Sequence, residues 1–240
     1  MNTSTDIPLR AWADMALLAL LWGAIFLFTA IALRELPPIW IVFQRVFWAA
    51  ALLWLYVLWR GLPVPRAPRI WGSFLVMGAL NNAIPFALIT WGQKTVESGL
   101  ASILNGSTAF FGVLVAALCL RDERLTARRG VGVLTGFAGV VVIIGPEALT
   151  GFDPRALGQL AILGATLSYA FAGVWGKLRL AGLAPAVSAA GMLTGSSLIT
   201  LILGLALDGA PPLSLSWATI GALAYAAVAA TAGAYLLYFR

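Results

Sequence analysis

The chain alternates long apolar stretches with short polar ones, and this pattern sets the expected architecture. Eight apolar stretches lie near 12–33, 39–59, 70–91, 95–120, 127–145, 157–177, 184–207 and 216–239. A helix needs about 20 mostly apolar residues to cross the ~30 Å hydrocarbon layer of a bilayer. The stretches lack the alternation of a β-barrel, and helices satisfy every backbone group internally. The pattern therefore predicts an all-α membrane protein.

Composition supports the same class. Hydrophobic residues make up 61% of the chain, charged residues 10%, and mean hydropathy is +0.95. Soluble domains typically have about 45–50% apolar and about 25% charged residues. Residues 1–10 are polar with one arginine, and the apolar stretch after them is too long for the core of a signal peptide. We therefore expect the first helix to remain in the protein.

Basic residues are distributed unevenly between the two sets of connecting segments. Of the 15 Lys and Arg residues, eleven fall in the set that contains the N-terminus, and three fall in the other set. Positively charged loops stay in the cytoplasm, so we expect the N-terminus to be cytoplasmic. The net charge of +6 is explained by topology, and we expect no nucleic-acid partner.

The residue types present exclude several kinds of chemistry. The chain has no histidine, and Cys119 is its single cysteine. Zinc hydrolysis by an HExxH motif, a Ser-His-Asp triad and a histidine proton relay are therefore excluded. We expect a protein that is not an enzyme and has no cofactor and no metal site.

Polar residues inside the apolar stretches are the candidates for function. Asn81, Asn82 and Asn105 lie on two consecutive stretches, either packing helices together or lining a shared cavity. Pro85 removes one helical hydrogen bond and predicts a kink. Arg45 lies roughly 9 Å from the outer end of its helix, within reach of the interface. It either braces neighbouring helices or contacts an anion.

Small and aromatic residues predict helix contacts and membrane position. Gly132 and Gly136 form a GxxxG motif, which favours close approach of another helix. This contact lies within the chain or, less favoured, between two copies, so we expect a monomer or weak homodimer. Tryptophans near helix ends are expected in the interfacial belts: Trp40, Trp59, Trp71 and Trp217.

The chain restarts at a nearly constant offset. Trp22 corresponds to Tyr169 and Pro38 to Pro185, each 147 residues on, and Trp71 corresponds to Trp217, 146 residues on. A repeat of five helices, an odd number, places its two copies in opposite orientations. We expect a first repeat at 1–147 and a second, inverted repeat at 148–240. The second holds three of its five helices, so we expect eight helices of a ten-helix protein.

Several of these stretches resemble the EamA-type modules of the drug/metabolite transporter superfamily. They are the aromatic-Gly pair Trp22-Gly23, the arginine early in the second helix, ASIL at 101–104 and LRDERLTARRGVGVLTGFAGVVVI at 120–143. Gly106 to Ala109 stand where the family has a proline, and Arg121 and Asp122 stand where it has a glycine.

The resemblance implies a bundle of ten helices in a bacterial inner membrane, with a central cavity that opens alternately to either side. The implied cavity residues are Trp22, Phe26, Asn81, Asn82, Phe86, Ser102, Asn105, Ser168, Tyr169, Trp175, Tyr225 and Tyr235. The aromatic members of this set could equally pack the bundle.

The acidic residues suggest which substrates such a cavity would accept. All Asp and Glu residues fall at helix ends or in loops, whereas a carrier of lipophilic cations is expected to bury a carboxylate. We therefore expect a neutral or zwitterionic small molecule. Within the resembled family this indicates an exporter of amino acids, aromatic ones favoured, without proton coupling. A proton-coupled multidrug or metabolite exporter and a non-transporting membrane scaffold remain alternatives.

Overall fold

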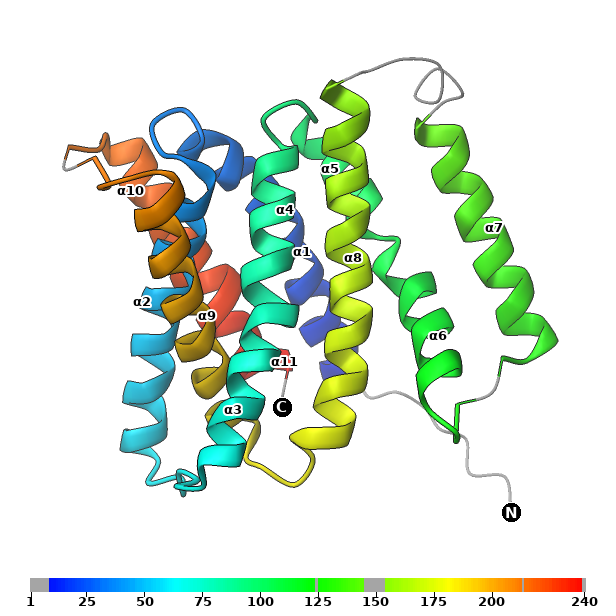
Figure 1. The fold of residues 1–240 in the computed structure, drawn as a ribbon, viewed down its shortest axis with the longest axis horizontal. Coiled ribbons are helices and arrows are strands. Elements are labelled where there is room, and N and C mark those ends of the chain that lie inside the picture. Colours follow the sequence, from blue (N-terminus) through cyan, green and yellow to red (C-terminus); the bar gives the residue numbers. More distant parts are fainter. Residues whose placement is uncertain (1–8, 124, 145–153, 213, 239–240) are drawn as a thin grey trace.

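The computed structural model describes residues 9–123, 125–144, 154–212 and 214–238, which contain helices and no strands. Figure 1 shows the helices packed side by side with parallel or antiparallel axes. Their bounds are α1 Leu9–Ala32, α2 Pro38–Trp59, α3 Pro68–Gly78, η1 Ala79–Ala83, α4 Ile84–Gly92, α5 Ser98–Asn105, α6 Thr108–Cys119, α7 Ala127–Ile144, α8 Pro154–Arg179, α9 Pro185–Leu207, α10 Trp217–Ala224, η3 Tyr225–Gly233 and α11 Ala234–Tyr238.

The predicted membrane helices are present. Within the described residues, seven continuous helical segments are long and apolar enough to cross a membrane. They coincide with seven of the eight predicted stretches, and the remaining stretch, 127–145, forms the 18-residue helix α7. The all-α membrane fold is therefore confirmed. The loop at 146–153 lies outside the described residues.

Two of the spanning segments contain a π-helix. In the third span, η1 separates α3 from α4 directly before Pro85, where the missing proline N–H was expected to disturb the helix. In the last span, η3 separates α10 from α11. The first residues of η1 and η3, Ala79 and Tyr225, are 146 residues apart, the same offset that relates Trp71 to Trp217.

The fourth span is broken although it has no proline. Helix α5 ends at Asn105 and α6 begins at Thr108, with Gly106 and Ser107 between them. The Ser107 hydroxyl donates to the Leu104 carbonyl at 2.6 Å and lies 3.1 Å from Thr166 Oγ1 on α8. The contact with Thr166 holds the break against α8.

The two halves of the chain interlock. Helices α2 and α9 pack on each other, and each also contacts the interrupted helix of the other half: α2 contacts η3, and α9 contacts α3 and η1. In the same way α1 packs on α10 and η3, while α8 packs on α4. Helices α1 and α8 run in opposite directions along the bundle (Figure 1). The inverted repeat, for which this exchange of partners is the expected arrangement, stays a prediction.

Close backbone approaches between helices are made by glycines that sequence reasoning had not selected. A Cβ on Gly195 would lie 2.9 Å from Leu75 Cα, and one on Gly78 would collide with the Met192 carbonyl oxygen. In the predicted GxxxG motif, a Cβ on Gly136 would lie 2.9 Å from the Phe110 ring, and Gly132 faces open space. The α3–α9 crossing therefore depends on small residues more than α7 does.

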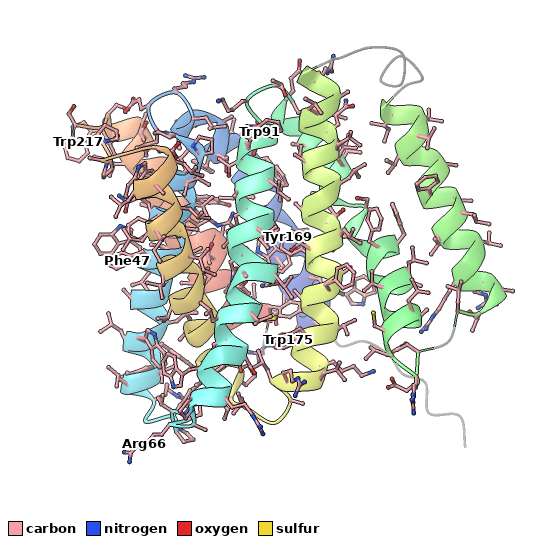
Figure 2. All side chains as sticks on the ribbon, in the orientation of Figure 1. Phe47, Arg66, Trp91, Tyr169, Trp175 and Trp217 are labelled. Atoms are coloured by element: carbon pink, nitrogen blue, oxygen red, sulfur yellow. The ribbon has the colours of Figure 1, made fainter. Side chains whose placement is uncertain are left out.

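The tryptophans predicted for the interfacial belts differ in exposure. Trp59 and Trp217 are 77% and 87% exposed, and Figure 2 shows Trp217 at the end of the bundle opposite Arg66. Trp40 is 3% exposed, and its Nε1 donates to the Gly209 carbonyl at 3.0 Å. The belt prediction for Trp40 is wrong, because the α9–α10 connection covers that side of α2.

Candidate functional site

A cavity of about 1000 Å³ lies inside the bundle. Its wall is formed by α1, α2, η1, α4, the α5–α6 break, α8, α9, η3 and α11. The lining extends from Gln93, just past the end of α4, to Lys177 near the end of α8 and Gly182 in the α8–α9 connection. The cavity therefore extends along the length of the bundle.

Most of the predicted site residues lie on this wall. The lining includes Trp22, Phe26, Asn81, Phe86, Asn105, Tyr169 and Tyr235, together with Arg45. Figure 2 shows Tyr169 at mid-height in the bundle. The ring of Tyr169 lies edge-on to Phe86, with 6.5 Å between ring centres. Trp22 donates from Nε1 to the Ala230 carbonyl at 3.2 Å, so its indole is fixed against η3.

The remaining predicted residues lie behind or beside the lining. Ser168 donates to the Leu80 carbonyl at 2.7 Å, and Trp175 Nε1 donates to the Ser73 carbonyl at 3.1 Å. Tyr225 stacks on Phe28, with 4.0 Å between ring centres, and its hydroxyl donates to the Leu21 carbonyl at 3.1 Å. Ser102 is half-buried on α5. Three of these four residues hold one helix against another.

The two adjacent asparagines of η1 share one partner on α11. Asn81 Nδ2 donates to the Tyr235 hydroxyl at 2.9 Å, and that hydroxyl donates to Asn82 Oδ1 at 3.0 Å. Asn81 lines the cavity, whereas Asn82 is fully buried behind it. Both alternatives left open for these amides are therefore present: Asn81 faces the cavity, and Asn82 packs two helices together.

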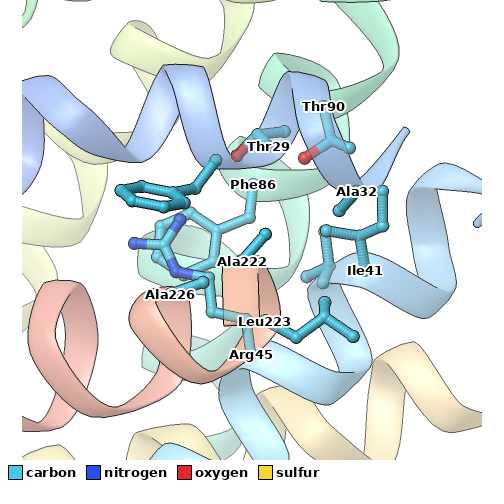
Figure 3. Close-up of a pocket in the computed structure, with 11 residues that line it drawn as sticks. Thr29, Ala32, Ile41, Arg45, Phe86, Thr90, Ala222, Leu223 and Ala226 are labelled. Carbon is cyan, nitrogen blue, oxygen red and sulfur yellow. The ribbon is translucent and has the colours of Figure 1, made fainter. Parts of the chain in front are cut away.

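Arg45 turns into the bundle. Its Nε donates to Thr231 Oγ1 at 2.8 Å, and its guanidinium carbon lies 3.7 Å from the centre of the Phe86 ring. Figure 3 shows the guanidinium beside Phe86 and between α1, α2 and η3. Arg45 therefore contacts α4 and η3, as the bracing alternative expected, and does not use its reach toward the interface, because Phe86 and Thr231 provide an inward cation–π contact and an acceptor.

A smaller hollow adjoins Arg45. It measures about 10 Å³ and is lined by Thr29, Thr90 and Phe86 among others (Figure 3). That volume is at the lower limit for one water molecule. Thr29 and Thr90 also line the main cavity. Arg45 is therefore the cationic group on a wall that is otherwise aromatic, aliphatic and hydroxyl-bearing at this level.

Gln93 is a lining residue that sequence reasoning missed. It follows the last residue of α4 and is 9% exposed. Its Nε2 donates to the Phe26 carbonyl at 2.8 Å and contacts Ser98 Oγ at 3.3 Å. In the sequence Gln93 lies just past an apolar stretch and next to the charged Lys94, a position typical of an exposed loop residue. Only the return of α5 toward α1 encloses it.

Charged groups gather at the opposite end of the cavity. Lys177 Nζ donates to Asp122 Oδ2 at 2.7 Å and to Glu123 Oε1 at 3.4 Å. The hydrogen bond from Lys177 holds the pKa of Asp122 below its usual value. These side chains are partly exposed, so the ion pairs contribute little to stability. They connect the α6–α7 turn to the end of α8 at the cavity rim.

No carboxylate is present among the described residues of the cavity wall. The described residues also contain no cluster of His, Cys, Asp and Glu that could hold a metal ion. The wall offers one inward guanidinium, one lysine at its rim, amides, hydroxyls and aromatic rings. This set can bind an anion or a neutral polar group and can stack on a planar one.

Comparison with known proteins decides the family. The EamA-like transporter family matches residues 12–145, which are more than half of the chain. The chain belongs to this family. The family is described as one of transporters, and this chain carries its multi-pass membrane fold.

Individual relatives cover the EamA-like chain to different extents. "Uncharacterized transporter YoaV" of Bacillus subtilis is 25% identical over 67% of this chain and 54% of its own length. "Probable amino-acid metabolite efflux pump" of Escherichia coli is 27% identical over 91% of this chain and 73% of its own length. The chain spans about half the length of several curated relatives that it matches.

A solved crystal structure shares the fold. It superposes with a TM-score of 0.67 at 19% sequence identity, covering 95% of this chain and 77% of that chain. At this identity the likeness concerns the arrangement of helices alone. It supports the packing described above for both halves of this EamA-like chain.

Proposed function

We propose that this EamA-like transporter exports neutral or zwitterionic metabolites, amino acids above all and aromatic ones in particular, by alternating access and without proton coupling. The observation that carries the proposal is the lining of the cavity: aromatic rings and amides around one inward guanidinium, with no carboxylate among the described lining residues. The E. coli relative, whose name specifies amino-acid metabolite efflux, supports the same substrate class.

Arg45 is the group that would hold the substrate carboxylate. Its Nε is engaged by Thr231, and one face of the guanidinium lies on Phe86. The guanidinium has five N–H donors, so donors remain for a carboxylate. Hydrogen bonds between charged partners in a low-dielectric site are stronger than neutral ones. Bracing by Thr231 and Phe86 also orients the guanidinium before the substrate arrives.

Aromatic side chains would hold the body of the substrate. Trp22, Phe26, Phe86, Tyr169 and Tyr235 contribute rings to the wall. Aromatic pairs gain about 0.5–1.5 kcal/mol beyond the burial of their area. The cavity volume of about 1000 Å³ is larger than the volume of one amino acid, as expected of a pathway that also admits water.

The lining argues against proton coupling through this part of the protein. A coupling site in a membrane is an acid or a histidine that binds and releases a proton. The chain has no histidine, and Asp122 and Glu123, the acidic residues that contact the lining, pair with Lys177 at the rim. The alternative is a proton-coupled multidrug or metabolite exporter whose acidic site lies outside the described residues.

Counterflow in proteoliposomes tests the proposal. The full-length gene product is reconstituted, and exchange of labelled tryptophan and phenylalanine is measured with and without an imposed pH gradient. We expect saturable exchange that does not depend on the gradient. Exchange that follows the gradient would favour the proton-coupled alternative, and no exchange of any amino acid would refute the substrate class.

Two arginine variants, tested in the same assay, distinguish an arginine that binds substrate from one that only sets the membrane orientation. Arg45→Gln removes the inward guanidinium, and we expect the half-saturating substrate concentration to rise about tenfold or more, as loss of a charge-assisted hydrogen bond implies. Arg66→Gln removes an exposed charge in the α2–α3 loop and serves as the control, with unchanged kinetics expected. Equal kinetics in both variants would remove Arg45 from the substrate site.

A further inference from the structure

The side-chain amide of Asn81 presents an unpaired oxygen to the cavity. Asn81 lines the cavity, and its Nδ2 donates to the Tyr235 hydroxyl at 2.9 Å. Its Oδ1 accepts no hydrogen bond from any described residue, yet it is not one of the buried unpaired atoms, as Asn82 Nδ2 is. Asn81 Oδ1 is therefore accessible, and a molecule in the cavity can donate a hydrogen bond to it.

Two neighbours fix which atom of this amide is free. The Tyr235 hydroxyl gives its one hydrogen to Asn82 Oδ1 at 3.0 Å, so toward Asn81 it can only accept. Met192 Sδ, 3.8 Å from Asn81 Nδ2, is also an acceptor. Reversal of the amide would turn its oxygen toward both acceptors. The free atom is therefore the oxygen, and the group that completes the site is a donor.

The last membrane span holds Arg45 and Asn81 one helical turn apart. Arg45 Nε donates to Thr231, and Asn81 Nδ2 donates to Tyr235. Thr231 and Tyr235 are four residues apart on the span Trp217–Tyr238. Residues at this spacing are neighbours on one side of a helix, about 5–6 Å apart. The guanidinium and the amide are therefore anchored at adjacent levels of the cavity wall.

The third membrane span gives the same register. The Arg45 guanidinium lies over Phe86 (Figure 3), which follows Asn81 by five residues. In a regular α-helix, five residues turn two side chains well away from each other. Here the π-helix η1 widens the turn, because the Ile84 N–H bonds to the Ala79 carbonyl five residues back. Asn81 and Phe86 consequently both line the cavity, one turn apart.

We propose that Asn81 Oδ1 accepts a hydrogen bond from the α-ammonium group of an amino acid whose carboxylate is held by Arg45. This inference rests on the function proposed above and specifies how the site distinguishes an amino acid from a simple carboxylic acid. The two charged groups of an α-amino acid are attached to one carbon. With a hydrogen bond of about 2.9 Å at each end, they can bridge two groups anchored one turn apart.

A neutral acceptor suits this position better than a carboxylate would. A carboxylate one turn from Arg45 would pair with the guanidinium and compete with the substrate. The amide oxygen accepts from an ammonium group, which has only donors, and leaves Arg45 free for the substrate carboxylate. The hydrogen bonds through Tyr235 to Asn82 orient the amide before the substrate binds.

The consequence is selectivity for the amino group. A site that hydrogen-bonds a substrate donor rejects an analogue without that donor, since the acceptor is then left unpaired. Phenylalanine should therefore be preferred over 3-phenylpropionate, which is the same molecule without the amino group. The hydrogen bond of a charged group corresponds to a preference of roughly 10-fold or more.

Competition in the counterflow assay measures this preference. Exchange of labelled phenylalanine by the reconstituted full-length protein is inhibited with unlabelled phenylalanine or 3-phenylpropionate, and the two inhibition constants are compared. The comparison is repeated with Asn81→Leu, which is similar in size and lacks the acceptor. It is repeated again with Met192→Leu, a matched control that removes the sulfur contact of Asn81 Nδ2 and leaves Oδ1 in place.

We expect the preference for phenylalanine in the unmodified protein and in Met192→Leu, and its loss in Asn81→Leu. If Asn81 only ties η1 to α11, its replacement will change both inhibition constants in proportion, and an unchanged ratio would overturn the inference. Equal inhibition by the two compounds in the unmodified protein, a result that requires no variant, would also overturn it while leaving amino acid transport intact. Absence of exchange altogether would overturn the proposed function and this inference with it.

Discussion

The crossing of α3 and α9 allows a quantitative prediction for Gly195→Ala. The added Cβ would lie 2.9 Å from Leu75 Cα and 3.1 Å from the Phe74 carbonyl oxygen, whereas ordinary contacts begin at 3.4 Å. Both neighbours are backbone atoms, so no side chain can rotate away. The two helices must separate by about 0.5 Å, and overpacking of this kind costs about 1–3 kcal/mol.

The matched control is Gly221→Ala, also within a helix but facing open space. Alanine is favoured over glycine in a helix by about 1 kcal/mol, and this gain is common to both variants. Their difference therefore isolates the clash, at about 1–3 kcal/mol. For a chain of this size, that difference corresponds to a Tm about 2–12 °C lower for Gly195→Ala.

Thermal unfolding of the purified protein in detergent, followed by tryptophan fluorescence, provides the measurement. Substrate exchange by the same preparations shows whether the surviving fraction keeps its cavity. If Gly195→Ala melts within about 1 °C of Gly221→Ala, the two helices are not in backbone contact at this point, and the crossing derived from the structure is refuted.

Two further predictions concern hydrogen bonds between the halves of the chain. Tyr235→Phe leaves the fully buried Asn82 without its partner and should lower stability by about 1–3 kcal/mol; unchanged melting relative to the half-buried control Tyr56→Phe would contradict this. Hydrogen bonds from Ser216 lower the pKa of the exposed Glu35 below its usual 4.5. Ionised Glu35 therefore stabilises the fold at pH values above its usual pKa, and this stabilisation is lost as the pH falls through the lowered pKa. The Tm difference between the unmodified protein and Glu35→Gln should shrink between about pH 5 and 3, and a constant difference would exclude the link.

The sequence by itself determined where the chain crosses the membrane. Length and hydropathy of a stretch are sums over its own residues, and a bilayer requires the same minimum from every helix. The seven spanning segments were therefore predictable without knowledge of their neighbours, as was the disturbance at Pro85, which follows from the proline's own missing N–H. The family resemblance came from similarly local patterns: Trp22-Gly23, Arg45 and residues 101–104 and 120–143.

Only the tertiary structure decided which side of each helix faces the cavity. Asn81 and Asn82 are adjacent and chemically identical, yet one lines the cavity and the other is sealed behind it, because Tyr235 approaches from a helix more than 150 residues away. Arg45 turned inward because Phe86 and Thr231 offer partners there. Gln93 became a buried acceptor because α5 folds back over it. Each outcome depends on the shape and chemistry of a distant segment. It therefore cannot be predicted from the residues of one stretch alone.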